Sequence, residues 1–456
     1  MSSFRSINPW NGEVLQEYSP TDSVAIEQAL TLAEHCFLSW REQSFLEKSS
    51  LFHQLAQLLR AQKEELAQLI SLEVGKVISE SRAEIEKCAL VCDFYADKAQ
   101  AYLEPETILL PDRKKAQVIF QPLGIILAVM PWNFPFWQVF RFAAPTLMAG
   151  NVGLLKHASN VPQCALAIQA LFTEAGFPPG CFQSLLIDGP RATALLDDPR
   201  VKGVSLTGSE KAGANVAAAA GKNLKKSLLE LGGSDPFIVL QDADLPLAAA
   251  TAVKARMLNF GQSCIAAKRF IIEAPVYDAF VDLFSQEFAK LRPGSPLDEQ
   301  ASYACMARPD LAAELYAQVS QTTIMGASVL LGGHPPKPGT AQIEPTVLAD
   351  IPKGSPAYSE ELFGPVASLF KVASAAEAIA LANATEFGLG ASIWTKDLSR
   401  GAMLAADIES GAVFLNSLVA SHPMLPFGGI KKSGYGRELS KQGILEFVNQ
   451  KTIYLG

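Results

Sequence analysis

Apolar residues in the first hundred positions recur every three or four places, which is the spacing of amphipathic helices. The pattern predicts one helix over 44–75, with apolar positions at Leu51, Leu55, Leu58, Leu59, Leu66 and Ile70. Ser44 with Glu47 has the spacing of a capping box at its start. A second helix is predicted over 79–102, ahead of two prolines. Both helices are expected to pack against a sheet.

The pattern changes after residue 112 to short β-branched runs. The runs 116–120 and 123–130, separated by Gln121-Pro122, suggest a strand pair. Strands and helices then alternate, with strands predicted at 152–156, 182–187 and 201–206, and helices at 162–175 and from about 209. This alternation predicts an α/β fold with a parallel sheet covered by helices on both faces.

A second αβ series is predicted from 244 to about 395. Its strands are expected at 270–272, 329–331 and 391–394, and the Pro/Gly-rich segment 334–340 reads as an exposed loop. The tail, 451–455, is short and β-prone. It could pair with another strand, including one of a second subunit.

The composition narrows the class of protein. The chain has 456 residues, of which 49% are hydrophobic and 18% charged, and its formal net charge is −8. This excludes a disordered chain, a coiled coil and a collagen-like fibre, and the length suggests two to three domains. An acidic chain without a Lys/Arg run is not expected to bind nucleic acid or an anionic membrane.

Seven cysteines are too few for a disulfide scaffold of this size, and the odd number leaves at least one thiol unpaired. A reducing compartment fits best. The longest apolar stretches, such as 124–130, fall far short of the ~20 residues that cross a bilayer. We therefore expect a cytoplasmic protein.

The segment 259–269, NFGQSCIAAKR, carries a candidate nucleophile at Cys264. A glycine in the preceding loop lets a ligand approach closely, and Lys268 and Arg269 could favour the thiolate. Taken alone, however, a cysteine among Ile and Ala is more often a small buried hydrophobic residue.

Two further residues could complete a catalytic group. Glu230 lies among leucines, where desolvation raises a carboxyl pKa toward the range of a general base, although a single Glu at a strand end is more often solvated and inert. Asn133, in a turn between two prolines, could present its amide to a developing oxyanion. Read alone, that segment is an aromatic turn.

Signals for a cofactor are weaker, and the chain has no GxGxxG. Gly208 and Ser209 stand at a strand-to-helix turn, where a helix N-terminus could receive a phosphate oxygen. An ordinary N-cap by Ser209 is an equal alternative. Lys156 ends a strand and could reach ribose hydroxyls. No metal is expected.

Together and in this order, these motifs resemble those of the aldehyde dehydrogenase superfamily over almost the whole chain. The matching segments are PWNF (131–134), LLKHAS (154–159), LTGSEKAG (206–213), LELGGSDPF (229–237), GQSC (261–264), EELFGP (360–365) and PFGGIKKSGYGRE (426–438). The resemblance implies that Cys264 is the nucleophile, Glu230 the general base and Asn133 the oxyanion-hole amide. It also implies a set of cofactor contacts, namely Trp132, Lys156, Ser159, Gly208, Ser209, Leu231, Glu361 and Phe363.

The resemblance also bears on the choice of cofactor. Many relatives that prefer NAD carry Glu at the position of Ser159, where a carboxylate would bind the 2′-hydroxyl and repel a 2′-phosphate. Ser159 removes that repulsion and Lys156 lies nearby in the sequence. We expect NADP to be accepted and preferred, with NAD also usable.

Within the superfamily, the segments 229–245, 266–273 and 428–439 are most similar to bacterial succinate-semialdehyde dehydrogenases. Arg141 matches the position of a substrate-carboxylate arginine there, and Ser421 is a candidate donor to the same carboxylate. A second arginine of that subgroup is replaced by Leu258. Ala266, two positions after Cys264, excludes the redox-switch disulfide that some relatives form there.

The expected activity is oxidation of an aldehyde, with succinate semialdehyde as the leading substrate. Leu258, Phe136 and Trp137 favour the alternative of a broad dehydrogenase for aliphatic or aromatic aldehydes. Acylation of coenzyme A is disfavoured by Glu230, and a non-catalytic binding protein by the presence of all three catalytic residues.

The resemblance implies an α/β architecture of two parallel-sheet domains and a small β oligomerisation element. The cofactor-binding domain is expected at 1–111 and 125–230, the catalytic domain at 231–427, and the oligomerisation element at 112–124 and 440–456. A homodimer or homotetramer is expected.

Overall fold

The first of two lobes is built on a six-stranded sheet. The computed structural model describes residues 3–111 and 114–455. The strands of this sheet, in spatial order, are β19 (Gly434–Tyr435), β9 (Lys226–Glu230), β8 (Val201–Thr207), β5 (Ile125–Met130), β6 (Val152–His157) and β7 (Phe182–Ser184). The five strands from β9 to β7 are parallel, and only the short β19 is antiparallel. The predicted alternation is confirmed, although β7 is shorter than the expected 182–187.

Helices pack around this sheet to form one apolar core. They are α1 (Ser23–Trp40), α2 (Phe45–Ala61), α3 (Lys63–Val74), α4 (Ile78–Tyr102), α5 (Trp137–Met148), α6 (Pro162–Glu174), α7 (Gly189–Ala194) and α8 (Glu210–Lys222). The capping box of Ser44 and Glu47 is present. The single helix expected over 44–75 is wrong: the backbone turns at Gln62 and divides it into α2 and α3. No Gly or Pro marks that break in the sequence.

The second lobe holds a seven-stranded sheet. Its strands, in spatial order, are β12 (Ser328–Leu331), β13 (Thr346–Ala349), β14 (Val366–Val372), β11 (Arg269–Glu273), β10 (Pro236–Val239), β16 (Gly390–Trp394) and β17 (Ala412–Leu415). All pairs are parallel except β12 with β13. Its helices are α9 (Leu245–Met257), α10 (Tyr277–Phe288), α11 (Pro309–Ile324), α12 (Pro356–Ser359), α13 (Ala375–Asn383) and α14 (Leu398–Ala406).

Both faces of this second sheet are buried. Phe237 and Val239 of β10 pack into the core that holds α9 and α10. The alternate residues, Ile238 and Leu240, pack into the core that holds α13. A sheet covered on both sides reads as a continuous apolar run, which is why PFIVL shows no alternation. Two parallel-sheet lobes confirm the expected fold class.

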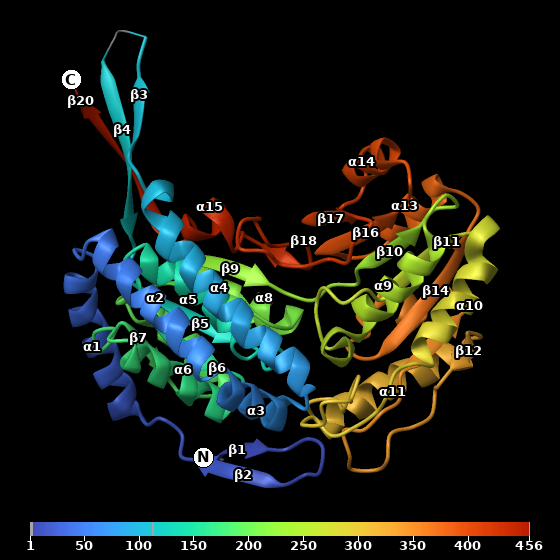
Figure 1. Ribbon diagram of the computed structural model, residues 1–456. Helices are drawn as coiled ribbons and strands as arrows, with labels where there is room; N and C mark the ends of the chain where they lie inside the picture. The colour runs from blue at the N-terminus through green and yellow to red at the C-terminus, as the bar shows by residue number, and fades with distance from the viewer. Residues whose placement is uncertain (1–2, 112–113, 456) are drawn as a thin grey trace.

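Three strands form an arm that projects from the body (Figure 1). They are β3 (Glu106–Leu109), β4 (Lys115–Pro122) and β20 (Val448–Leu455), and β4 lies in the middle. The expected pairing of 116–120 with 123–130 is therefore wrong, because β4 pairs with β3 and β20 while β5 enters the six-stranded sheet. The expected element at 112–124 includes 112 and 113, which lie outside the described residues.

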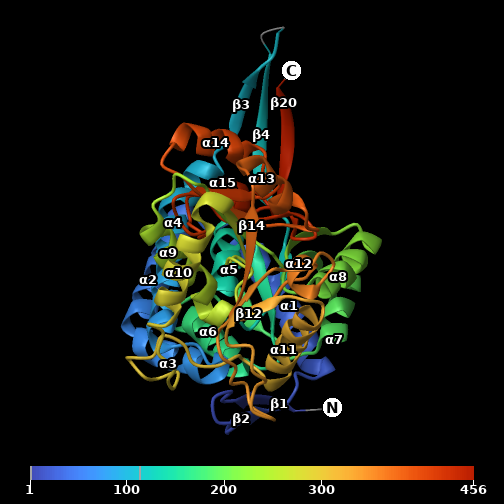
Figure 2. The same cartoon turned by 90° about the vertical axis from the view of Figure 1, so that its right-hand side faces the viewer.

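The remaining elements connect the two lobes or close their edges. The hairpin of β1 (Phe4–Ile7) and β2 (Val14–Tyr18) lies at the end of the molecule away from the arm (Figures 1 and 2). A two-stranded ladder joins β15 (Phe387–Gly388) to β18 (Ile430–Lys431), and α15 (Ser440–Ile444) precedes β20. The segment 334–340 is an exposed loop without helix or strand, as predicted.

Candidate functional site

Three parallel strands of the first lobe bring predicted residues to one edge of the sheet. β5 ends at Met130 ahead of Asn133, β8 ends at Thr207 ahead of Gly208, and β9 ends at Glu230 itself. Because the carboxyl ends of parallel strands meet on one side, residues far apart in the chain converge there. The fold thus explains why these motifs follow strands.

A cavity of about 320 Å³ lies at this edge. Its lining includes most of the residues that the resemblance assigned to the cofactor, together with two catalytic candidates: Trp132, Gly208, Ser209, Leu231, Glu361, Phe363, Asn133 and Cys264. The rings of Trp132 and Phe363 meet edge to face with centroids 6.0 Å apart. Flat apolar walls of this kind fit a planar ring of a ligand.

Ser209 caps a helix and also lines the cavity. Its hydroxyl accepts the backbone N–H of Ala212 at 3.4 Å and caps the N-terminus of α8, and the residue also lines the cavity. Gly208 has only one atom within 4 Å of the place that a Cβ would take. The turn therefore leaves room for a phosphate beside a helix N-terminus.

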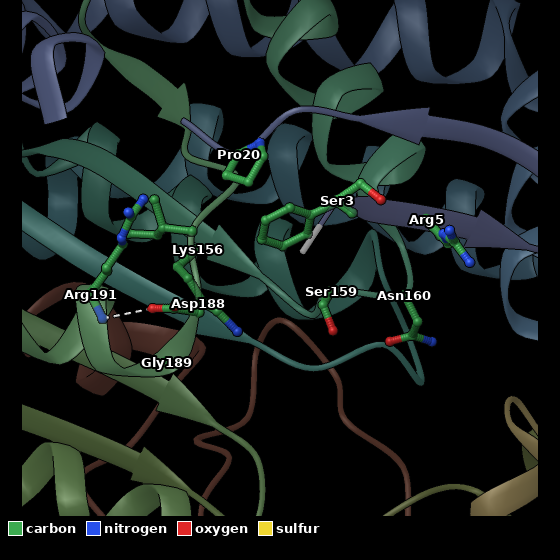
Figure 3. Close-up of a pocket in the computed structure, with 11 residues that line it drawn as sticks. Ser3, Arg5, Pro20, Lys156, Ser159, Asn160, Asp188, Gly189 and Arg191 are labelled. Carbon is green, nitrogen blue, oxygen red and sulfur yellow. Dashed lines mark hydrogen bonds between the residues drawn. The ribbon is translucent and has the colours of Figure 1, made fainter. Parts of the chain in front are cut away.

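A second cavity, of about 540 Å³, lies next to the end of β6 (Figure 3). Lys156 and Ser159 line it, and Figure 3 shows both side chains pointing toward the same open region. Arg5 from β1 also lines this cavity. Asp188 is a carboxylate in the same cavity, and it accepts the backbone N–H of Arg191 at 2.9 Å. The cavity therefore contains cations and hydroxyls that suit a phosphorylated ribose.

The residues before Cys264 adopt a strained backbone. Asn259 and Phe260 have φ of 50° and 55°, and Gly261 has φ of 74°. Two hydrogen bonds hold Asn259. Its backbone N–H donates to Glu80 Oε1 at 3.0 Å, and its side-chain Nδ2 donates to the backbone carbonyl of Asn133 at 2.7 Å. Left-handed backbone at residues other than glycine persists only where its surroundings impose it.

The side chain of Lys268 stabilises the loop around Cys264 by binding the backbone carbonyls of that loop. Its Nζ donates to the carbonyls of Ser263 and Cys264, each at 2.9 Å, and lies 3.2 Å from Glu361 Oε1. Arg269 donates to three carbonyls elsewhere, among them that of Ser234. The expectation that both cations serve the thiolate is therefore wrong for Arg269, whose guanidinium is occupied in the second lobe.

Cys264 is half-buried, whereas the other six cysteines are buried. Burial raises the pKa of the Cys264 thiol to about 12, although Arg141 and Lys268 act in the opposite direction. Cys264 lines both the cofactor-side cavity and a third cavity described below.

The Asn133 side chain points toward the nucleophile loop. Its Nδ2 donates one hydrogen to the carbonyl of Gln262 at 3.0 Å. The bond fixes the orientation of the amide, because only the NH₂ end can donate to that carbonyl. The second hydrogen of the NH₂ group is then available to an oxyanion formed near Cys264.

Glu230 is buried, with 2% of its surface exposed. Neither of its carboxylate oxygens has a hydrogen-bond partner among the described residues. Burial raises its pKa well above the ordinary value, and the nearby Glu438 adds to this effect while Arg141 opposes it. A buried, unpartnered carboxyl group with a raised pKa is suited to accept a proton at neutral pH.

The third cavity, of about 160 Å³, opens on the other side of Cys264. Arg141, Ser421, Trp137 and Leu258 all line it, whereas Phe136 does not: its ring is buried and stacks on Phe140. The lining is mainly apolar with a few polar groups, which is typical of a small-molecule site.

Arg141 is already bound within the protein. Its guanidinium forms a buried ion pair with Glu438, donates to Thr207 Oγ1 at 3.4 Å and lies over the ring of Phe427 at 4.6 Å. Ser421 Oγ accepts a hydrogen bond from Lys87 Nζ at 2.7 Å. A substrate anion that reached Arg141 would therefore bind a guanidinium that is already paired with Glu438.

Sequence reasoning missed three residues of this site, namely Lys87, Glu84 and Glu438. Glu84 accepts the N–H groups of Phe136 and Trp137 and so fixes the start of α5. Lys87 and Glu84 lie on a helix whose pattern indicated only packing, so the sequence offered no local signal for them. Glu438 stands within the segment 426–438, where the motif was noted but no role was assigned.

Two negative findings hold for residues 3–111 and 114–455. No group of three His, Cys, Asp or Glu side chains lies close enough together to hold a metal ion. No helix is both long and apolar enough to span a bilayer.

Comparison with known proteins agrees with this geometry. The model of the aldehyde dehydrogenase family matches residues 1–453. The chain is 52% identical to a probable NADP⁺-linked succinate-semialdehyde dehydrogenase of Synechocystis sp., over 99% of both chains. It is 47% identical to succinate-semialdehyde dehydrogenase [NADP⁺] 1 of Mycobacterium tuberculosis, again over 99% of both.

Solved structures give the same result. Succinic semialdehyde dehydrogenase of Streptococcus pyogenes, in complex with NADP⁺, superimposes with a TM-score of 0.97 at 38% identity and covers 99% of both chains. Sequence, fold and the cavities around Cys264 lead to one conclusion: the chain belongs to the aldehyde dehydrogenase family.

Proposed function

We propose that this aldehyde dehydrogenase oxidises succinate semialdehyde to succinate with NADP⁺. One observation carries the proposal: Cys264 lies where a cavity with flat aromatic walls meets a narrow apolar cavity that contains cationic groups. The first suits a nicotinamide and the second an aldehyde with a distal negative charge. Relatives named for this substrate and cofactor at 47–52% identity support it.

The proposed reaction begins at the sulfur of Cys264. The thiol of Cys264 would release its proton to water as Sγ forms a bond to the aldehyde carbon, and the carbonyl oxygen would take the electron pair of the broken C–O π bond to become an oxyanion beside Asn133 Nδ2 and the backbone N–H of Cys264. A nicotinamide held in the cavity of Trp132 and Phe363 would supply the hydride acceptor for oxidation of this carbon. Cys264 then holds a thioester, which water attacks as Glu230 takes the water's proton. The C–S bond breaks and releases the carboxylate.

The cofactor residues proposed are those that line the two outer cavities. Gly208 and Ser209 would receive the pyrophosphate, while Trp132, Leu231, Glu361 and Phe363 would surround the nicotinamide ribose and ring. We assign Lys156 and Ser159 to the adenosine ribose and its 2′-phosphate. NAD⁺ would also bind, more weakly, because Ser159 brings no carboxylate to that position.

An alternative function is a broad aldehyde dehydrogenase for aliphatic or aromatic substrates. The apolar lining contributed by Leu258 and Trp137 favours it.

The wider assignments follow from the family. We propose a cofactor-binding domain at 1–111 and 125–230, a catalytic domain at 231–427, and an oligomerisation element at 112–124 and 440–456 that joins subunits into a homodimer or homotetramer. Within the described residues all seven cysteines are free, which is consistent with a reducing cytoplasm.

Steady-state kinetics followed by NADPH absorbance at 340 nm test the proposal. We expect kcat/KM for succinate semialdehyde to exceed that for hexanal or benzaldehyde at least about tenfold, because a buried charge-assisted contact contributes ~1.5–3 kcal/mol. We expect NADP⁺ to be preferred over NAD⁺. Equal or better turnover of the two neutral aldehydes would contradict the substrate assignment, and Cys264→Ser is the control for background reduction.

A further inference from the structure

Lys87 on α4 lines the third cavity and has no role in the reaction proposed above. Its Nζ donates to Ser421 Oγ at 2.7 Å and lies 4.3 Å from the centroid of the Trp137 ring. The residue lines the same cavity as Cys264. A cation is thus held, by a hydroxyl and an aromatic face, in the space where an aldehyde would enter.

Lys87 forms no ion pair with a carboxylate in the described part of the chain, where its hydrogen-bond partner is a hydroxyl. The nearby acids have other contacts: Glu84 pairs with Lys76, and Glu80 accepts the N–H of Asn259. Arg141, by contrast, is neutralised by Glu438. Lys87 is half-buried, and an anion stabilises a cation that is partly withdrawn from water and forms no ion pair, so the cavity favours an anion next to Lys87.

We propose that Lys87, together with Ser421, binds the distal carboxylate of the substrate and so determines its selectivity. This inference rests on the proposed function and names the residue that recognises the anion. Ser421 Oγ already lies against Nζ, and the two can donate side by side to one carboxylate. Similar enzymes carry a second arginine at the position of Leu258. Lys87, on α4, would supply the positive charge that Leu258 lacks.

Butanal is the matched probe, because it has the same four carbons and lacks only the distal carboxylate. We expect Lys87→Met to raise KM for succinate semialdehyde at least about tenfold, with kcat within about twofold and the kinetic constants for butanal unchanged. Lys98→Met is the control: Lys98 lies on the same helix but is exposed, and its replacement should alter neither substrate.

A pH profile provides a second readout. Burial and the nearby Arg141 lower the pKa of Lys87 to about 8, while Cys88, Glu84 and Cys264 act in the opposite direction. The protonated amine binds the anion, so KM for succinate semialdehyde should rise as the pH increases above 8. Lys87→Arg keeps its charge, and its KM should stay flat over the same range.

The outcomes separate this inference from the proposed function. If the natural protein does not prefer succinate semialdehyde to butanal, the proposed function fails whatever the variants do. If it does prefer the anion, and Lys87→Met leaves the ratio of the two kcat/KM values unchanged, the role of Lys87 is wrong. A Lys87→Met protein that unfolds at the same denaturant concentration as the natural protein, but loses the same share of activity toward both aldehydes, would also contradict the role of Lys87. A preference retained by Lys87→Arg would support it.

Discussion

Single residues at this site derive their chemistry from burial. The thiol of Cys264 and the carboxyl of Glu230 both have raised pKa values because apolar surroundings disfavour their charged forms. For Glu230 the shift makes proton uptake easier. For Cys264 the shift favours the thiol over the thiolate, and Arg141 and Lys268 oppose it. The leucines around Glu230 allowed the sequence to predict an apolar environment and a raised carboxyl pKa. The contribution of Glu438 to that pKa could not be predicted, because Glu438 is distant in the chain.

The role of Ser159 in the choice between NADP⁺ and NAD⁺ can be tested with a single substitution. Ser159→Glu would place a carboxylate in the cavity of Lys156 (Figure 3). We expect kcat/KM for NADP⁺ to fall at least about tenfold, since like charges repel at short range, and that for NAD⁺ to hold or rise. Ser50→Glu, at an exposed position on α2, controls for added negative charge. A preference for NADP⁺ that survives Ser159→Glu would remove Ser159 from the 2′-phosphate site.

At the scale of elements, the sequence predicted what depends on local pattern. In the first lobe β5, β6, β7, β8 and helices α4, α6 and α8 were located because burial leaves a periodic trace, whereas in the second lobe only β11, β12 and β16 were located. The break at Gln62 and the partner of β4 were not predicted, because each depends on packing between segments remote in the chain. The loop before Cys264 was predicted in part. Its glycine was evident in the sequence, but the left-handed backbone of Asn259 and Phe260 was not, because it results from contacts with Glu80 and Asn133.

Gly261 tests whether this loop needs its backbone form. A Cβ there would overlap the carbonyl oxygen of Gly364, and φ is 74°. Gly339 has the same φ of 74° but no atom within 4 Å of a Cβ, so Gly339→Ala measures the conformational strain alone. We expect Gly261→Ala to lower the free energy of unfolding by ~2 kcal/mol more than Gly339→Ala, and to lose activity. Equal losses of stability in denaturant titrations would contradict the overlap.

On the scale of the whole molecule, residues of the first lobe contribute to all three cavities, and the arm projects from the body (Figures 1 and 2). The arm has little to stabilise it within one chain. β3 is exposed along its length, and of β20 only Val448 is buried. β20 is also an edge strand, so one row of its backbone groups is open to pairing. An exposed apolar ribbon of this kind is typical of a subunit interface.

Charges on that ribbon should therefore separate subunits without unfolding either lobe. Ile453 and Leu455 are 37% and 47% exposed and lie two positions apart, on one face of β20. We expect Ile453→Glu with Leu455→Glu to shift the mass measured by light scattering from a dimer or tetramer to a monomer, because carboxylates resist burial in an interface. Val24→Glu with Leu46→Glu places the same charge at exposed apolar positions on the body and should leave the mass unchanged. An unchanged mass in the arm variant, or a monomeric natural protein, would rule out the arm as the interface.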